Sequence, residues 1–336
     1  MSNDLYFADS LAFLGPQGER PIFNPWKRPW LRLAHVTSVP PTRKPIDMYD
    51  FDTAFAAHCT FRKNALSNAL VHTVRTRSDL DKAGIGLLFG MQHAPDGLTL
   101  ERVRQLSDAG VRVMGLAYDE ASEYGSGYKV GGGLTGRGRE LLRWMAACSV
   151  IPDLSHLNER TAIETLEFIR DERLPLKPMA SHSGCYCVYP HARNLSDNAI
   201  RKIIALKGYV GIPTITFLIG KGEEGADHLG TMMKHFAWIN YLRGSENLGV
   251  GSDGVHQDMT MDEARVHFDR MTALLKGHLP DGLSFPDRPP ELIMGGSRMF
   301  EIIKERMVWG KFPPGLIRNL LGENFRVFLH RSLPRA

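Results

Sequence analysis

Along most of the chain, short apolar runs alternate with longer segments that have the periodicity of amphipathic helices. Two of the helical segments open with residues that cap helices well, Asn158 and Ser196. Nearly continuous apolar strands separated by helices are typical of a parallel sheet that helices cover on the outside. We therefore predict helices over 98–110, 136–149, 158–172 and 196–208, and strands over 53–60, 84–91, 111–118, 149–156, 176–182, 208–214 and 248–253.

One more apolar stretch, LYFADSLAFL, lies near the N-terminus at residues 5–14 and brings the predicted strands to eight. Eight strand–helix units in a chain of 336 residues predict an α/β protein with a (β/α)8 TIM barrel rather than a doubly wound sheet. No GxGxxG motif follows the first strand and no P-loop is present, so a nucleotide-binding fold has little support. We expect residues 1–336 to form one barrel domain.

Two segments interrupt this rhythm. Residues 15–50 are rich in proline, which excludes regular helix and central strand, so we expect an irregular surface excursion that either covers the molecule as a lid or packs on it. Residues 254–296 form a long loop after the eighth strand, and three prolines near Phe285 favour a fixed path over the pocket rather than a mobile flap. This loop could set the choice of substrate.

Composition and charge narrow the partners that the chain could have. Lys and Arg number 41 and Asp and Glu 37, without a block of like charges, so nucleic-acid binding is disfavoured. No apolar run reaches the roughly 20 residues that span a bilayer, and no signal peptide is recognisable, so we expect no membrane association. Four cysteines are too few for a disulfide framework in a chain of this length, which favours reduced thiols and a cytoplasmic protein.

Polar side chains lie at most of the predicted strand ends, where barrel enzymes carry their chemistry. A single histidine there is usually structural, but two on adjacent strands lie roughly 5 Å apart and can bind one metal ion. His156, in DLSH, and His182, in ASHS, are such a pair on the fifth and sixth strands. The other polar strand residues are Gln92 and His93 on the third strand, Tyr118 and Asp119 on the fourth, Asp153 on the fifth, Asp253 on the eighth, and His58 within the second.

Arg193 lies in the loop after the sixth strand, just before the cap of the next helix. A guanidinium at the mouth of a barrel can hold a carboxylate through two hydrogen bonds. An arginine that braces its own loop through backbone carbonyl groups would have the same position in the sequence. The residues alone leave both roles open.

Several motifs resemble, in order and spacing, those of the membrane (renal) dipeptidase family of zinc peptidases. They are GLTGRGRELLRWM, IPDLSHLNERT, PMASHSG, PHARNLSDNAIRKI, GYVGIP, LGVGSDG and LLGENFRVF, and the similarity extends from about residue 84 to 330. The resemblance implies a (β/α)8 barrel of the metallo-dependent hydrolase type, in agreement with the strand count. It also implies hydrolysis of dipeptides, including those with a C-terminal D-residue, and in some members of β-lactams.

Four functional residues of the family have matches in this chain. The resemblance assigns His156 and His182 as ligands of the second zinc ion. It assigns Arg193 as the arginine that grips the carboxylate of the substrate. Asp253, in GVGSD, matches the aspartate that handles the proton during attack and departure of the leaving group.

Other functional positions differ from the family. Leu11 and Phe13 stand where the first strand of the family carries its His-x-Asp zinc ligands, with Asp9 aligned to the aspartate before that motif. Gln92 replaces a bridging glutamate, and a neutral amide cannot bridge two Zn2+ ions as a carboxylate does. Tyr118 replaces a histidine that polarises the substrate. These losses agree with one another and predict that the first metal site is absent.

We therefore expect a dipeptidase-like enzyme, a metallohydrolase of the amidohydrolase type, that acts on a dipeptide or a small carboxylate-bearing amide with one zinc ion at most, or none. Asp253 and Tyr118 would be catalytic, as general base and as hydrogen-bond donor to the oxyanion. Gln92, His58 and His93 would line the substrate pocket with Arg193, and His58 or His93 could supply the third ligand that two neutral imidazoles need.

Two alternatives stay open. A metal-free enzyme could use Asp253 with His156 or His182 as acid and base on an amino-acid or betaine-like substrate. A non-catalytic homologue could keep only the carboxylate grip of Arg193. The resemblance also suggests a homodimer to which the amphipathic C-terminal helices contribute, although packing in the core explains those helices equally well.

Overall fold

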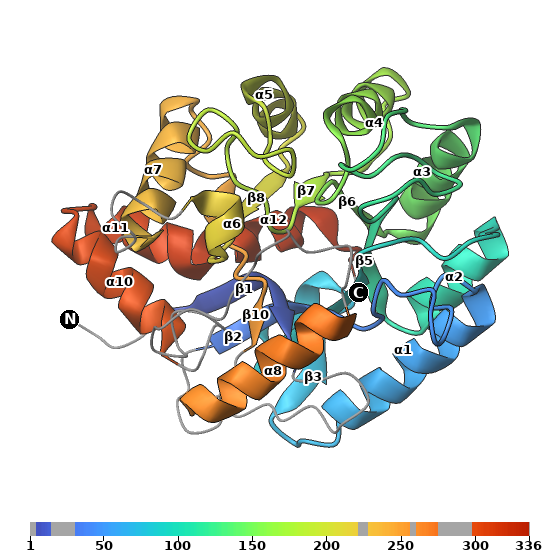
Figure 1. Ribbon diagram of the computed structural model, residues 1–336, viewed down its shortest axis with the longest axis horizontal. Coiled ribbons are helices and arrows are strands. Elements are labelled where there is room, and N and C mark those ends of the chain that lie inside the picture. Colours follow the sequence, from blue (N-terminus) through green and yellow to red (C-terminus); the bar gives the residue numbers. More distant parts are fainter. Residues whose placement is uncertain (1–4, 15–30, 221–227, 256–259, 275–297, 336) are drawn as a thin grey trace.

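The computed structural model describes residues 5–14, 31–220, 228–255, 260–274 and 298–335. Within these ranges, parallel strands form a barrel that helices surround (Figure 1). This architecture confirms the predicted (β/α)8 TIM barrel. The strands, in order around the barrel, are β1 (Phe7–Phe13), β2 (Leu31–Thr37), β4 (Ile85–Met91), β5 (Val111–Gly115), β6 (Ile151–Asp153), β7 (Met179–Ala180), β8 (Tyr209–Ile212) and β9 (Leu248–Val250).

The ring is completed by a short strand, β10 (Gly254–Val255), which follows β9 after residues 251–253 and pairs with β1. A further short strand, β3 (Val71–Thr73), pairs with the beginning of β4. Every pairing in the sheet is parallel, so all eight barrel strands end on the same side of the molecule. Polar residues that follow the strands are therefore brought to one rim.

Helices cover the outside of the barrel, and several begin at the caps that the sequence offers. Asn158 accepts a hydrogen bond from Thr161 N, and Ser196 accepts one from Ala199 N, as predicted for these two helix starts. The helices of the described ranges are α1 (Phe51–Ala65), α2 (Leu100–Asp108), α3 (Gly136–Cys148), α4 (Glu159–Asp171), α5 (Asp197–Ala205), α6 (Thr216–Ile219), α7 (His228–Tyr241), α8 (Met261–Leu274), α10 (Met299–Trp309), α11 (Pro314–Arg318) and α12 (Asn324–Ser332), with the short turns η2 (Arg77–Asp81) and η4 (Asn319–Glu323).

Two layers of apolar side chains stabilise this arrangement. Inside the barrel, inward-facing residues of successive strands pack on one another and on α12. The ring of Tyr209, at the start of β8, lies 5.0 Å from that of Phe325 and 5.5 Å from that of Phe328. A second, larger layer lies between the barrel and the surrounding helices. Because α12 closes the end at which the strands begin, the opposite end is left for polar side chains.

The predicted second strand was wrong. Residues 53–60 lie in helix α1, and the second barrel strand is Leu31–Thr37, inside the segment that we expected to be irregular. Asp50 caps the helix by accepting a hydrogen bond from Thr53 N, and the buried positions of α1 follow a helical rather than an alternating spacing. In β2 every residue except Arg32 is buried. The apolar run of this segment, rather than that of 53–60, therefore indicates the second barrel strand.

The remaining parts of the two irregular segments are only partly described. Residues 15–30 lie outside the described residues. The segment after the eighth strand, 254–296, contains β10 and helix α8, which corrects its prediction as a plain loop. The prolines near Phe285 lie outside the described residues, so the predicted path over the pocket stays a prediction.

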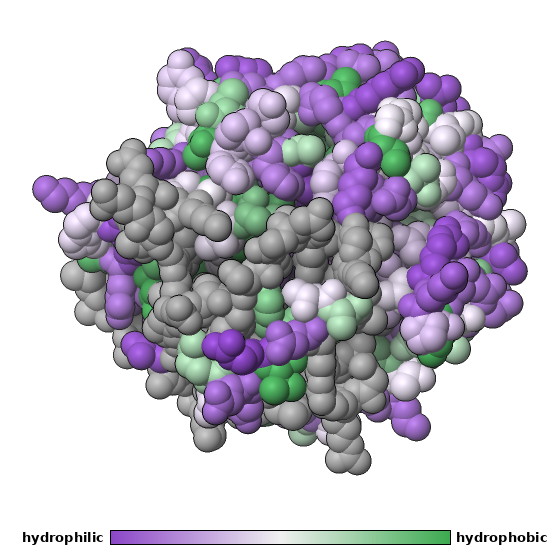
Figure 2. All heavy atoms as spheres, in the orientation of Figure 1, coloured by the Kyte–Doolittle hydropathy of each residue, from purple (hydrophilic) through white to green (hydrophobic). Residues whose placement is uncertain are grey.

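The surface is polar over the outer helices on the face shown in Figure 2, where hydrophilic residues predominate. Among the described residues, no helix combines the length and the apolar character that crossing a bilayer requires. All four cysteines are free thiols.

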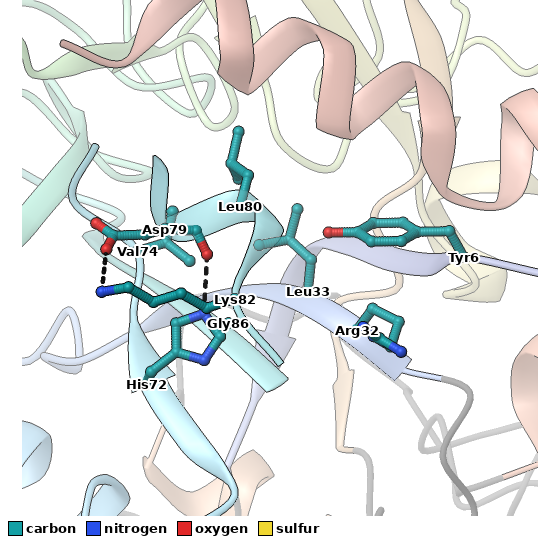
Figure 3. Close-up of a pocket in the computed structure, with 9 residues that line it drawn as sticks. All are labelled: Tyr6, Arg32, Leu33, His72, Val74, Asp79, Leu80, Lys82 and Gly86. Atoms are coloured by element: carbon teal, nitrogen blue, oxygen red, sulfur yellow. Dashed lines mark hydrogen bonds and ion pairs between the residues drawn. The ribbon is translucent and has the colours of Figure 1, made fainter. Parts of the chain in front are cut away.

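A small polar hollow lies at the end of the barrel where β2 and β4 begin (Figure 3). A carboxylate oxygen of Asp79 lies 2.6 Å from Lys82 Nζ, and the carbonyl oxygen of Asp79 accepts a hydrogen bond of 3.0 Å from His72 Nε2. Because these groups satisfy one another, they fasten the η2 turn to β3 rather than offer groups to a ligand.

Glycines allow close packing just below the polar rim. A Cβ on Gly211 of β8 would overlap the carbonyl oxygen of Ser181 and the hydroxyl of Ser10. That hydroxyl donates to the carbonyl oxygens of Ser181 at 2.7 Å and Val250 at 3.0 Å, so β1 is tied across the barrel to the ends of β7 and β9.

We expect Gly211→Ala to lower the free energy of unfolding by about 1–3 kcal/mol, because the added methyl group forces a backbone carbonyl and a buried hydroxyl apart. Gly315→Ala is the control: Gly315 lies in α11, a Cβ there meets nothing within 4 Å, and alanine favours the helix by about 0.5–1 kcal/mol. Urea unfolding followed by circular dichroism measures both variants. Equal stabilities would contradict the close packing inferred here.

Candidate active site

Two histidines meet at the rim where β6 and β7 end. The Nε2 atoms of His156 and His182 lie 2.9 Å apart, and both side chains are buried. His156 has a φ of 72°, in the left-handed region that residues other than glycine rarely adopt, and such strain is concentrated at functional sites. The structure thus brings together the pair that the sequence predicted as metal ligands.

Gln92 joins the pair from the end of β4. Its Oε1 lies 2.9 Å from His156 Nε2, and its side chain is buried. The position that the sequence resemblance compared with a bridging carboxylate therefore faces the histidines, but with an amide. Three potential acceptor atoms, two imidazole nitrogens and one amide oxygen, converge on one small volume.

The other side of His156 contacts the end of β5. Its Nδ1 lies 2.7 Å from Oδ1 of the buried Asp119, and its ring stacks on Tyr118 with 3.8 Å between centroids and 24° between planes. With the Asp119 carboxylate accepting, the Nδ1–H of His156 is the donor. The Nε2 atom of the neutral ring then carries a lone pair that points toward Gln92 and His182.

His182 is oriented by a chain of hydrogen bonds that ends on a buried carboxylate. Ser181 Oγ donates to Asp153 Oδ2 at 2.5 Å and lies 2.7 Å from His182 Nδ1. Since the serine proton is engaged, His182 Nδ1–H is the donor to Ser181 Oγ, and His182 Nε2 also presents a lone pair. Ser252 Oγ and Asp9 make a similar contact of 2.5 Å at the joint between β9 and β1.

Arg193 reaches this cluster from the loop before α5. Its Nη2 donates to His182 Nε2 at 2.8 Å, while its buried Nη1 has no hydrogen-bond partner among the described residues. A buried guanidinium with an unused donor is costly, and an anionic group of a ligand would satisfy it. The residue therefore faces the site rather than bracing its own loop.

The electrostatics keep both imidazoles neutral. Burial, and then the Arg193 guanidinium, lower the pKa of His156 to about 4. The same two causes, followed by the neighbouring His156, hold the pKa of His182 well below its usual range. Neutral imidazole is the form that binds a metal ion or accepts a proton.

Asp253 and Tyr118 complete the cluster. Burial raises the pKa of Asp253 to about 7, although the Arg193 guanidinium opposes this rise. Burial, and then the carboxylates of Asp119 and Asp253, raise the pKa of Tyr118 well above its usual value, so its hydroxyl stays a donor. Asp253 also has a left-handed φ of 53°, and its backbone N donates to Leu11 O at 2.9 Å.

Three neutral donor atoms of the cluster are placed so that they could hold a metal ion. His156 Nε2, His182 Nε2 and Gln92 Oε1 could hold a single ion, because two imidazole lone pairs 2.9 Å apart favour a cation between them. The apolar Leu11 and Phe13, on β1, offer no ligand for a second. Among the described residues, no group of three or more His, Cys, Asp or Glu side chains could hold a metal.

Two predicted pocket residues lie elsewhere. His58 is on the outer helix α1, with Nδ1 2.8 Å from Ser38 Oγ and Nε2 3.2 Å from Ala109 O. Both its nitrogens fasten the helix to the barrel, so His58 neither lines the pocket nor supplies a third ligand. This error follows from the mistaken second strand.

His93 is the second. It is buried, with Nε2 3.0 Å from Met48 O and its ring 4.1 Å from that of Tyr49. These contacts direct it toward the segment before α1, and the structure records no contact with either histidine of the cluster. Its buried Nδ1 has no hydrogen-bond partner among the described residues, so the expected role of His93 as a pocket residue or ligand stays a prediction.

Sequence reasoning also missed three contributors. The sequence places Asp119 and Asp153 at strand ends without indicating a role for them, and Ser181 stands out only as part of the ASHS motif. The sequence signal that could have found them is their position, because each directly precedes or follows a site residue or ends a strand. A third histidine, His35 of β2, was placed in the irregular segment, but it is fully buried and contacts Ser10 O through Nδ1 at 2.7 Å.

Comparison with known proteins identifies relatives of this chain and of its fold. The family described as membrane dipeptidase, peptidase family M19, matches residues 55–276, about two thirds of the chain. The dipeptidase tcpJ of Claviceps purpurea is 30% identical over 149 residues, which cover 43% of this chain and 33% of that protein. The aligned segment thus spans only a third of the length of this curated relative.

Two solved structures share the whole fold. An amidohydrolase from Pseudomonas aeruginosa superposes with a TM-score of 0.78 at 21% identity, covering 97% of this chain and 96% of the other. A metallopeptidase from Rhodobacter sphaeroides, solved with a phosphinate mimic of the dipeptide L-Ala-D-Ala, has a TM-score of 0.71 at 17% identity and covers 98% and 99%. The extent of the family match, together with the ordered motifs, shows that this chain belongs to the membrane dipeptidase family of hydrolases.

Proposed function

We propose that this chain hydrolyses a dipeptide, or a small amide that carries a carboxylate, at a site that holds one metal ion at most. The observation that carries the proposal is the convergence of three acceptor atoms, with contacts of 2.9 Å. The resemblance adds that Leu11 and Phe13, which cannot bind a metal, stand where the family has the ligands of its first zinc ion. His156, His182 and Gln92 would hold the ion, and Zn2+ is the one we expect because imidazole suits it. When bound, such an ion lowers the pKa of water and polarises the amide carbonyl.

The residues around this position have distinct tasks. Arg193 binds the carboxylate of the substrate through its unused Nη1, which fixes the amide beside the histidines. Asp253, with a pKa near 7, takes a proton from the attacking water. Tyr118 keeps its proton and donates a hydrogen bond to the developing oxyanion.

We prefer a dipeptide as the substrate class for two reasons. Its free carboxylate can pair with Arg193, and one structural relative was solved with a dipeptide mimic. The metallopeptidase from Rhodobacter sphaeroides was solved with a mimic of L-Ala-D-Ala. The free carboxylate of such a dipeptide is the kind of acceptor that Arg193 Nη1 could bind. We also propose a cytoplasmic location, based on the free thiols, and keep a homodimer as an expectation from the resemblance.

One contact favours a second candidate, a metal-free enzyme on an amino-acid or betaine-like substrate. Arg193 Nη2 already donates to His182 Nε2, and its fixed charge opposes a nearby cation. A rotation of the Gln92 amide by about 180° would also give His156 Nε2 a donor in place of an ion. In that case His156 or His182 would act with Asp253 as acid and base. A protein that binds a carboxylate without turnover is the remaining alternative.

Metal content separates these possibilities. We expect no more than one Zn2+ per chain after dialysis against a Zn2+ solution. The His156→Ala variant should lose that ion, because the remaining imidazole of His182 and the amide of Gln92 bind Zn2+ weakly. Elemental analysis by mass spectrometry measures both. His330→Ala, which removes an exposed histidine, should keep the ion. Two ions per wild-type chain would refute the one-ion site, and turnover without any ion would favour the metal-free candidate.

The carboxylate grip predicts a substrate preference. We expect Arg193→Ala to raise KM for a dipeptide by about 10–100-fold, because one charge-assisted pair is lost, and to leave the weaker turnover of the C-terminally amidated dipeptide nearly unchanged. Steady-state kinetics on the two substrates measure the preference. Arg201→Ala, an exposed position on α5, serves as control. A variant that still prefers the free carboxylate would remove Arg193 from this role.

The raised pKa of Asp253 predicts opposite effects on activity and stability. Turnover should rise with pH through about 7, as the base loses its proton, and Asp253→Asn should abolish it. The pKa of Asp253 in the folded state lies above the ordinary value of 3.8, so the protonated form favours folding below about pH 4, and this contribution is lost as pH rises through 7.

Asp253→Asn should therefore be more stable than wild type at pH 8, by at most about 4 kcal/mol at roughly 1.4 kcal/mol for each pKa unit. Thermal unfolding between pH 4 and 8 measures this. Asp262→Asn, an exposed position in α8, should follow wild type in both assays. A pH-independent difference in stability would contradict the raised pKa.

A further inference from the structure

The carboxylate of Asp119 contacts His156 directly, and no role follows for it from the sequence motifs. It lies in the segment that follows β5, is 1% exposed, and has Oδ1 2.7 Å from His156 Nδ1. Its Oδ2 lies 3.5 Å from Lys129 Nζ. The pair Asp119–His156 therefore connects the ends of two neighbouring strands with a buried charge.

The backbone around this pair is fixed. Tyr128 N donates to His156 O at 2.8 Å, and Lys129 N donates to Asp119 O at 3.0 Å, so one loop bridges both residues. The ring of His156 is held on one face by Tyr118 at 3.8 Å. The backbone bonds therefore hold the two residues next to each other, and the imidazole cannot turn away without losing its contact with Asp119 and its stacking on Tyr118.

We propose that Asp119 is a positioning residue that fixes the Nδ1–H form of His156 and so presents Nε2 to the cavity as a lone pair. The consequence of this inference, the binding of an ion or a proton at Nε2 of His156, rests on the proposed function. It deepens that function, because a ligand whose other nitrogen donates to a carboxylate is a stronger base.

The charge of the site explains why such help is needed here. The three converging groups, His156, His182 and Gln92, are all neutral, and the Arg193 guanidinium lies close to them. His182 is oriented through the hydroxyl of Ser181, which passes on the effect of Asp153 only indirectly. Asp119 is therefore the carboxylate in direct contact with one of the converging side chains, among the contacts that the structure records for the described residues.

Asp119→Asn tests the proposal with little change of shape. Lys129 Nζ is a donor and would hold the amide oxygen, so the amide N–H would face His156 Nδ1. His156 must then accept at Nδ1 and carry its proton on Nε2, where it donates to Gln92 Oε1. The lone pair toward the cavity would be lost although the fold is retained.

The experiment is nuclear magnetic resonance of the metal-free protein labelled with 15N-histidine. We expect His156 to be the Nδ1–H form in wild type and the Nε2–H form in Asp119→Asn, while Glu120→Gln, at the exposed neighbouring position, keeps the wild-type form. The signals of His156 are identified by their absence from His156→Ala. Asp119→Ala, which lacks any acceptor, should also shift to the Nε2–H form and provides a second variant.

Calorimetric titration of Zn2+ into the same proteins measures the consequence. Affinity should fall by about 10–100-fold in Asp119→Asn and stay at the wild-type value in Glu120→Gln. A wild-type His156 in the Nε2–H form, or a variant that keeps the Nδ1–H form, overturns the proposal, and so does unchanged affinity. If wild type binds no Zn2+, the one-ion function fails, and the His156 signals alone decide the role of Asp119.

Discussion

Two imidazole nitrogens 2.9 Å apart, each on a ring whose other nitrogen is already engaged, constrain everything around them. Lone pairs at this distance repel unless a proton or a cation lies between them. Burial and the Arg193 guanidinium disfavour the proton by lowering the pKa of both rings. In the proposed function, either one bound cation or a rearrangement of the Gln92 amide would relieve this contact, and the two outcomes correspond to the two candidate mechanisms.

Some of the charged groups near this contact have hydrogen-bond or ion-pair partners, and one has a donor atom left over. Asp153 is satisfied by Ser181 and Asp119 by His156 and Lys129, so both serve to orient the histidines. Arg193 keeps one buried donor, Nη1, for which the described part of the chain offers no partner. An anionic substrate would satisfy this donor and draw the guanidinium from His182 Nε2, the atom that an ion would need. Binding of substrate and of an ion would then assist each other, since both relieve the same contact.

The barrel below the rim supplies the rigidity that such a contact needs. The hydroxyl of Ser10 ties β1 to the ends of β7 and β9, and glycines such as Gly211 leave room for that bridge. Left-handed backbone at His156 and Asp253 is tolerated because surrounding hydrogen bonds fix both residues. These two strained residues lie at the rim, while the apolar layers inside and outside the barrel bear the stability of the fold.

The sequence by itself determined the barrel, the ordered motifs and the residues His156, His182, Gln92, Arg193, Tyr118 and Asp253 that the structure gathers at one rim. Buried strands and capped helices leave local signals, and the ends of parallel strands must meet. It did not determine the second strand, since TAFAAHCT is apolar enough for either state and the prolines around LRLAHVT concealed a strand.

Only the tertiary structure decided what each polar group contacts. It removed His58, whose nitrogens fasten α1 to the barrel, and it brought Asp119 and the Ser181–Asp153 pair behind the two histidines. Such partners come from different strands, so no spacing along the chain records their distance. A strand end can be read from local pattern, whereas the direction and the partner of its side chain are set by the packing of the whole barrel.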